Sequence, residues 1–255
     1  GCHYGASLAL NETGDRLAIL ASVRGKYYIT NDAYSRVFIK KLVVNSWNDV
    51  NDDNDDRIFH REPSRGTITS IDLDSTGNTL IVSSQYARDS YLDHLENQFS
   101  GGVSSTTVVG AVLIYQYETD KFVLKSGLLG SQNNILTRRC FVNDDSTMIL
   151  LTMSTVGESN QYYRFYEISS GGIIGDKKGD DLTFNGYTYY KNNIFAGLVE
   201  EMVVVYEYNE ISEGWDRKGN DVRIPDYPTG TIPNGSITSI YMNGGGVIED
   251  NNYSL

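Results

Sequence analysis

The chain has 255 residues and carries 33 acidic against 21 basic side chains, for a formal net charge of −12 at pH 7. This balance opposes binding to nucleic acid, which relies on neutralisation of phosphates, and no run of about 18 apolar residues is present to span a bilayer. With 19 tyrosines, 25 glycines and only 4 prolines, the composition favours strands joined by turns over helices.

A motif of alternating apolar and polar residues occurs three times, at 7–17, 70–80 and 139–149. Each copy reaches a polar turn, which contains Gly14 in the first copy and Gly77 in the second, and then resumes with an apolar run. This pattern predicts a two-stranded hairpin whose glycine is free to adopt a positive φ. The copies lie about 63 and 69 residues apart, which is too long for one hairpin and a connection.

A second type of apolar-rich strand fills the remainder of each repeat, at 36–40, 110–117, 162–168 and 202–208. Two of these strands continue through a short polar turn to a returning aromatic residue, Phe122 or Trp215. Two hairpins per repeat give four antiparallel strands, and a four-stranded sheet repeated radially is a propeller blade. We therefore predict an all-β fold, a β-propeller of four-stranded antiparallel blades.

Weaker copies extend the pattern toward the end of the chain. Residues 186–198 are predicted to form another first hairpin, with a turn at Asn192 and Asn193, and 236–246 resemble the opening of yet another. We expect about four blades and a partial fifth, in a single propeller domain or a segment of a longer propeller. The approximate repeats are 1–65, 66–130, 131–180, 181–232 and 233–255.

The pattern S-x-x-L-x-x-x-G-[DN]-x-L, followed by V-x-V-Y-x-Y and a downstream Trp or Phe, resembles the roughly 60-residue blades of FG-GAP and integrin-α-like propellers. It is also similar to long repeat proteins of algae and bacteria. The best matches are 5–22, 68–86, 110–126 and 201–216. The resemblance implies a rigid disc, usually outside the cell, that serves adhesion or forms a module of a larger structure. The integrin-type calcium loop D-x-D-x-D-G is not intact in any repeat.

The acidic segment at 49–56 is the best candidate for a metal-binding site, and its residues suggest calcium as the bound ion. Oxygen-bearing side chains alternate there as in the first positions of a calcium loop: Asp49, Asn51, Asp53 and Asp55. Asn54 stands where an EF-hand has glycine, and His60 stands where it has a bidentate glutamate. The alternative is a solvated acidic loop that carries no ion. A second charged stretch, 175–181, mixes both signs and is interpreted as an exposed turn without a ligand.

Three sequons for N-glycosylation are present, at Asn11, Asn234 and Asn252. Asn11 is the preferred position if the chain is secreted, because it lies in a predicted hairpin turn. The two cysteines, Cys2 and Cys140, fall in different repeats, and both a disulfide and two separate thiols are compatible with the sequence.

The sequence offers few candidate catalytic residues. The three histidines lie in separate segments, and none is beside a nucleophile motif. Propellers do support glycosidases that use paired acids across the central channel. The first strands of the three clear repeats, which should line the axis, carry Ala9, Asp72 and Phe141 at equivalent positions. One acid among three positions does not make a catalytic pair.

We therefore predict a non-catalytic, extracellular propeller that serves as a structural or adhesive module, in a surface coat or filament, and contacts other protein subunits or surface glycans. The alternative is a carbohydrate-active propeller enzyme that uses axial carboxylates. Recognition is expected in the long inserts 45–65 and 84–110, which break the repeat. The second insert supplies the candidate interaction residues Tyr86, Tyr91, Leu92, Leu95 and Phe99. The competing interpretation is a loop that covers its own sheet.

Overall fold

The computed structural model describes most of the strands and the turns between them. The described residues are 2–24, 33–50, 67–85, 99–100, 110–130, 134–155, 161–184, 188–191, 193–199, 202–223, 241–242 and 248–249. Among these residues, no helix is long and apolar enough to cross a membrane.

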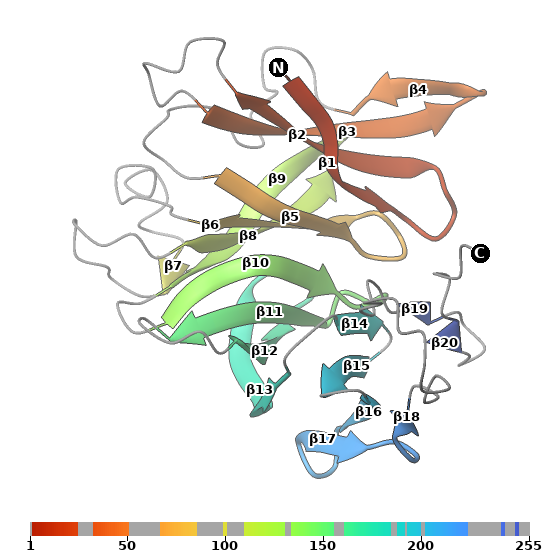
Figure 1. Ribbon diagram of the computed structural model, residues 1–255. Helices are drawn as coiled ribbons and strands as arrows, with labels where there is room; N and C mark the ends of the chain where they lie inside the picture. The colour runs from red at the N-terminus through yellow and green to blue at the C-terminus, as the bar shows by residue number, and fades with distance from the viewer. Residues whose placement is uncertain are drawn as a thin grey trace, which may run out of the picture.

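The strands form four antiparallel sheets in chain order, each of which is a propeller blade (Figure 1). Blade 1 consists of β1 (Cys2–Leu10), β2 (Arg16–Arg24), β3 (Ala33–Val43) and β4 (Ser46–Asp49). Blade 2 consists of β5 (Thr67–Leu73), β6 (Thr79–Gln85), β8 (Ala111–Glu118) and β9 (Lys121–Leu129), with β7 (Phe99–Ser100) parallel to β9. Blade 3 consists of β10 (Asn134–Val142), β11 (Met148–Thr155), β12 (Gln161–Ile168) and β13 (Ile174–Thr183).

Blade 4 is smaller, and two further strands follow it. It consists of β14 (Thr188–Lys191), β15 (Ile194–Val199), β16 (Met202–Asn209) and β17 (Gly214–Arg217), with β18 (Val222–Arg223) also paired to β16. A separate two-stranded sheet contains β19 (Tyr241–Met242) and β20 (Ile248–Glu249). The prediction of an all-β propeller of four-stranded blades is thus confirmed, including the hairpin expected at 186–198.

The turn between the first two strands has the same hydrogen bonds in blades 1, 2 and 3. Its first residue is Asn11, Asp74 or Asn143, and the side-chain oxygen of that residue accepts the backbone amide five residues later at 2.8 Å in all three blades. The fourth residue of the turn has a positive φ, 69° at Gly14, 69° at Gly77 and 58° at Ser146. Glycine adopts this conformation without steric cost, which explains the glycine of the repeated motif.

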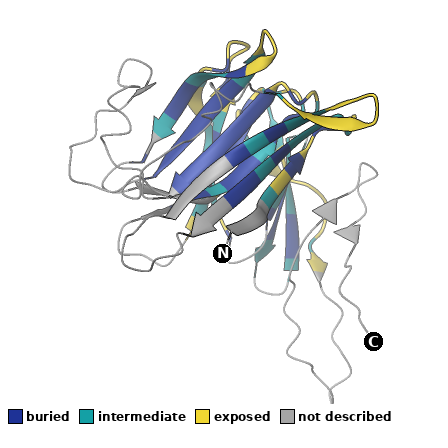
Figure 2. Cartoon of the chain, turned by 90° about the horizontal axis from the view of Figure 1, so that it is seen from above, coloured by how far each residue is buried: buried dark blue, intermediate teal, exposed yellow. Residues whose placement is uncertain are grey.

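Apolar clusters between successive blades form the core. The cluster between blades 1 and 2 includes Leu20, Ile39, Leu73 and Leu113, and the next one includes Ile81, Ile114 and Ile149. The cluster between blades 3 and 4 is aromatic, with Phe165 and Phe195 fully buried. Figure 2 shows that burial is concentrated in the middle of the strands, whereas hairpin tips such as the one between β3 and β4 are exposed.

Two segments differ from the expectation. Residues 175–181 belong to strand β13 and are not an isolated turn. The insert predicted at 45–65 begins with strand β4, which pairs with the end of β3. Both are outer strands with exposed and charged side chains, so they lack the apolar alternation by which inner strands are recognised.

Candidate functional site

The first strands of the four blades, β1, β5, β10 and β14, lie side by side around the inner edge of the molecule (Figure 1). On these strands, Leu73, Val142 and Tyr190 are buried in the apolar clusters shared with the preceding blade, and Leu10 occupies the equivalent position of blade 1. The residue before each of them therefore occupies an equivalent position on the other face of the strand. These residues are Ala9, Asp72, Phe141 and Tyr189.

Asp72 is the acid at this position, and it joins two blades. Its Oδ2 accepts the backbone amide of Val142 on β10 at 3.0 Å, and its Oδ1 accepts the amide of Leu73 at 3.0 Å. The side chain is partly exposed, whereas both of its chain neighbours are buried. Each carboxyl oxygen has a second lone pair, so these bonds leave room for a proton on the group.

The pKa of the Asp72 carboxyl is raised from 3.8 to about 7. Loss of hydration in the protein interior is the main cause, and the negative charges of Asp144 and Asp74 act in the same direction. The two backbone amides that donate to Asp72 oppose the shift but do not cancel it. A carboxyl group that titrates near neutral pH is suited to giving and taking protons.

Three groups from blades 3 and 4 accompany Asp72, and we call the four residues the axial site. They are Asp144, Tyr189 and Lys191. Asp144 lies in the inner turn of blade 3, and its Oδ2 is 3.8 Å from the Nζ atom of Lys191 on β14. Burial raises the pKa of the Tyr189 phenol, and the charges of Asp144 and Asp72 raise it further, so this hydroxyl stays protonated and can donate a hydrogen bond.

Asp74 is near the axial site but has a structural role. Its Oδ1 accepts the amide of Thr79, and its Oδ2 accepts the hydroxyls of Thr76 at 2.7 Å and Ser146 at 2.8 Å. Ser146 belongs to blade 3, so Asp74 closes its own turn and holds the next blade. The side chain is only 3% exposed and its oxygens are engaged by these donors.

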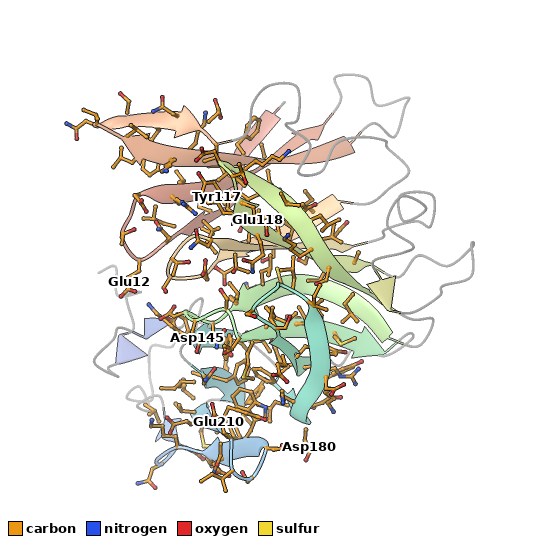
Figure 3. The ribbon with its side chains drawn as sticks, turned by 180° about the vertical axis from the view of Figure 1, so that it is seen from behind. Glu12, Tyr117, Glu118, Asp145, Asp180 and Glu210 are labelled. Carbon is orange, nitrogen blue, oxygen red and sulfur yellow. The ribbon has the colours of Figure 1, made fainter. Side chains whose placement is uncertain are left out.

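Other acidic side chains surround the inner turns. Figure 3 labels Glu12 and Asp145, which are exposed residues of the turns in blades 1 and 3, and they lie along the side of the molecule where β19 and β20 are found. Within the described residues, no group of three or more histidine, cysteine or acidic side chains could hold a metal ion.

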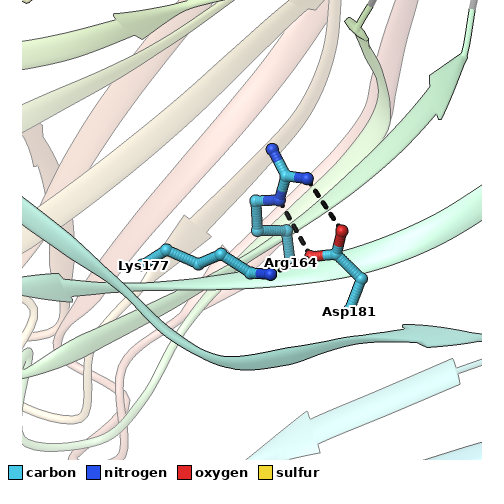
Figure 4. Close-up of polar contacts among 3 residues, drawn as sticks. All are labelled: Arg164, Lys177 and Asp181. Carbon is cyan, nitrogen blue, oxygen red and sulfur yellow. Dashed lines mark hydrogen bonds and ion pairs between the residues drawn. The ribbon is translucent and has the colours of Figure 1, made fainter.

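A second cluster of charges, on blade 3, is internally paired (Figure 4). The guanidinium of Arg164 donates to both carboxyl oxygens of Asp181, from Nε at 2.9 Å and from Nη2 at 2.7 Å, and the Nζ atom of Lys177 is 3.1 Å from Oδ1. Burial would raise the pKa of Asp181, but the hydrogen bonds from the two cations outweigh it, so the pKa is lowered. This cluster ties β13 to β12.

The metal site expected at 49–56 falls largely outside the described residues. Asn51, Asp53 and Asp55 lie there, and only Asp49 is described. Asp49 forms an ion pair with Lys40, whose Nζ is 2.6 Å from Oδ1. Calcium binding at this segment stays a prediction.

The glycosylation candidates Asn234 and Asn252 also lie outside the described residues. The side chain of Asn11 is 4% exposed, and its Nδ2 donates to Thr13 at 2.9 Å and to Asp15 at 2.7 Å. A glycan on this nitrogen would have to replace these bonds. Glycosylation at Asn11 stays a prediction, and it would require the loss of these two hydrogen bonds.

The expected interaction residues are similarly placed. Tyr86, Tyr91, Leu92 and Leu95 lie outside the described residues, and Phe99 is in β7, where only the backbone is described. Cys140 is a free thiol buried on β10, and burial raises its pKa to about 12. The disulfide left open by the sequence is therefore absent at Cys140.

No family model and no curated protein sequence matches this chain. Solved structures do resemble it. A provisionally assigned 6-phosphogluconolactonase from Bacteroides uniformis has a TM-score of 0.50 at 7% identity, over 85% of this chain and 54% of that one. A microbial sialidase has a TM-score of 0.47 at 8% identity, over 84% and 46% of the two chains. An oligogalacturonate lyase in complex with manganese has a TM-score of 0.46 at 8% identity, over 83% and 52%.

The chain thus spans about half the length of these structures. The first of these structures is described as an enzyme, so the expectation of a non-catalytic adhesive module is corrected. Identities this low establish the fold alone, and the resemblance to FG-GAP blades stays a prediction. The chain has the fold of a β-propeller built from four-stranded antiparallel blades.

Proposed function

We propose that this chain is part of a carbohydrate-active propeller enzyme in which Asp72 transfers the proton that cleavage of a glycosidic bond requires. The observation that carries the proposal is the pKa of Asp72, which is raised to about 7 on the innermost strand of blade 2. Glycosidic cleavage uses two acidic side chains, one that donates a proton and one that acts as a carboxylate. Asp72 and Asp144 supply these two groups from adjacent blades.

The roles follow from the environments of the two acids. Protonated Asp72 would donate to the leaving oxygen of the sugar, because desolvation keeps its proton in place near neutral pH. Asp144, which faces the ammonium group of Lys191 at 3.8 Å, would activate water or stabilise positive charge on the sugar ring. The Tyr189 hydroxyl would position a sugar oxygen by donating a hydrogen bond.

A purely structural role for Asp72, as a link between β5 and β10, is the competing explanation. The equivalent positions of blades 1 and 3 hold Ala9 and Phe141, so the blades pack without an acid at this position. This difference supports a functional reason for Asp72. It does not depend on the activities of the similar structures.

The test is hydrolysis of a panel of nitrophenyl glycosides and polysaccharides by the whole chain between pH 4 and 9. We expect Asp72→Asn to lower the rate about 100-fold or more, because general acid catalysis contributes at least that factor. Asp180→Asn, at an exposed position on the outer strand β13, is the matched control and should retain full activity. Equal rates for wild type and Asp72→Asn, or no hydrolysis of any substrate by a folded wild type, would refute the proposal.

A further inference from the structure

Blade 1 has two apolar faces, and the described strands of the neighbouring blades cover one of them. The face toward blade 2 carries Ala9, Ala18, Leu20, Val37 and Ile39, which are all at most 6% exposed. The side chains of the other face alternate with these along the same strands. We call Leu8, Leu10, Leu17 and Ile19 the open face of blade 1.

The open face exposes large apolar side chains that are buried at equivalent positions of the other blades. Leu8 is 62% exposed and Leu10 is 57% exposed. Their equivalents in blade 2, Ile71 and Leu73, are 4% and 6% exposed because blade 1 covers them. In blade 3, Cys140 and Val142 are likewise buried against blade 2.

The inner turn of blade 1 lacks the same neighbour. The amide of Glu12 donates to the carbonyl of Ser75 at 3.0 Å, and the amide of Ser75 donates to the carbonyl of Asp144 at 3.3 Å. The turns of blades 2 and 3 thus each accept a hydrogen bond from the turn of the preceding blade. In the part of the chain that the structure describes, no backbone amide donates to the carbonyl of Glu12, which occupies the accepting position in blade 1.

The glycines of the two turns show the same difference. A side chain placed at Gly77 would approach Arg16 of the preceding blade to 2.8 Å, and the Arg16 guanidinium donates to the Gly77 carbonyl at 2.8 Å. At Gly14, the equivalent position of blade 1, nothing lies within 4 Å. The space that a preceding blade fills over Gly77 is open over Gly14.

We propose that the open face of blade 1 binds a further four-stranded propeller blade of the same type, one that presents small and branched apolar side chains like those that blade 1 presents to blade 2. The occupant follows from continuity with the interfaces already formed, since side chains, turn carbonyl and glycine all repeat the receiving half of a blade contact. Burial of apolar surface is the driving force, as in the three contacts between the described blades. This inference does not rest on the proposed enzymatic function.

The direct test adds such a blade to the full chain. A copy of residues 1–50 is joined through a short linker before Gly1 in a Cys2→Ser, Leu10→Cys background, and the rate of thiol labelling at position 10 is measured. Cys140 does not interfere, because it is buried and its pKa is raised to about 12. We expect the added blade to slow labelling at position 10 at least tenfold.

Two controls identify the contact. Val44→Cys, at a hairpin position that is 90% exposed, should label equally with and without the added blade. Leu20→Glu in the added copy alone should restore rapid labelling at position 10, because it places a charge in the new contact. Unchanged labelling in the presence of the added blade would overturn the proposal.

A measurement on the unextended chain covers the case in which the added blade does not fold. Leu10→Glu should shift the melting midpoint by less than about 2 °C, whereas Leu73→Glu at the equivalent buried position should abolish cooperative unfolding. Equal destabilisation by the two substitutions would refute the proposal. A native mass of twice 28.4 kDa with position 10 protected from labelling would assign the face to a second copy instead, and would also refute it.

Discussion

At the scale of single residues, Asp72 combines a structural contact with an unfavourable place for a negative charge. Its carboxyl accepts the amide of Val142 across the contact between blades, yet burial raises its pKa to about 7. The folded chain therefore holds a proton on Asp72 at pH values where the unfolded chain has already released it. A raised carboxyl pKa of this kind makes stability depend on pH with a definite sign.

We expect the stability contributed by protonated Asp72 to be fully present below about pH 4 and to be lost as the pH rises to about 7. The shift corresponds to at most about 4 kcal/mol, and we expect about 2 kcal/mol because solvent screens this partly exposed group. Urea unfolding of wild type and Asp72→Asn should therefore diverge, with wild type losing about that much relative to the variant between pH 4 and 8. Parallel pH profiles for the two proteins would contradict the assignment, and Asp180→Asn should follow wild type throughout.

At the scale of elements, the inner turns both reverse the chain and join the blades. Gly14 and Gly77 have the same φ of 69°, but only Gly77 lies beneath a side chain of the preceding blade, that of Arg16. The two glycines therefore separate the cost of the backbone conformation from the cost of the contact between blades.

Gly14→Ala should cost about 1–2 kcal/mol, the penalty of a left-handed conformation for a residue with a Cβ. Gly77→Ala should cost at least about 1 kcal/mol more, because its Cβ would also lie 2.8 Å from Arg16 Cδ and 3.1 Å from Asn11 Cβ. Denaturant unfolding of both variants measures the difference. Equal losses would mean that Arg16 moves aside freely and that this contact does not constrain the turn.

The inner elements could be predicted from the sequence, and the outer ones could not. Alternation and the repeated glycine predict β1, β2, β5 and β6, because each pair of strands is rich in apolar residues and is joined by a turn that favours glycine. The sequence predicts an insert at β4 and a turn at β13, because the side chains of these outer strands follow no apolar period. Residue 179 in β13 is a glycine with a φ of 63°, which further disguises that strand as a turn.

The candidate site was only partly predictable for a related reason. Alignment of the repeats placed Asp72 at the axis, but Asp144 and Lys191 come from other blades and meet only once the sheets are packed side by side. The repeated motif does not identify Tyr189 as a site residue, because the inner turn of blade 4 is shorter and does not match that motif. The raised pKa of Asp72 arises from desolvation, which depends on packing and leaves no local pattern in the sequence.

At the scale of the whole molecule, the blades differ in how many neighbours they have. Blades 2 and 3 are packed on both faces, whereas blade 1 is packed on one and exposes Leu8 and Leu10 on the other. In a repeat architecture, the stability of each unit depends on its nearest neighbours. The molecule should therefore open from blade 1 before its central blades.

Hydrogen exchange followed by mass spectrometry tests this order. We expect amides of β2 to exchange at least tenfold faster than those of β6 and β11, whose blades have neighbours on both sides. The comparison uses strands in the middle of their sheets where both sets of backbone groups are paired, β2 against β6 and β11. Equal protection in all three blades would show that the sheets unfold as one unit and that the open face does not weaken blade 1.

The measurement that tests the central claim most directly is a titration of the Asp72 carboxyl by carbon NMR, with the resonance assigned by its absence in Asp72→Asn. We predict a pKa of about 7 in the folded chain. A value near 4, the ordinary range for aspartate, would contradict both the proton-transfer role of Asp72 and the pH dependence of stability.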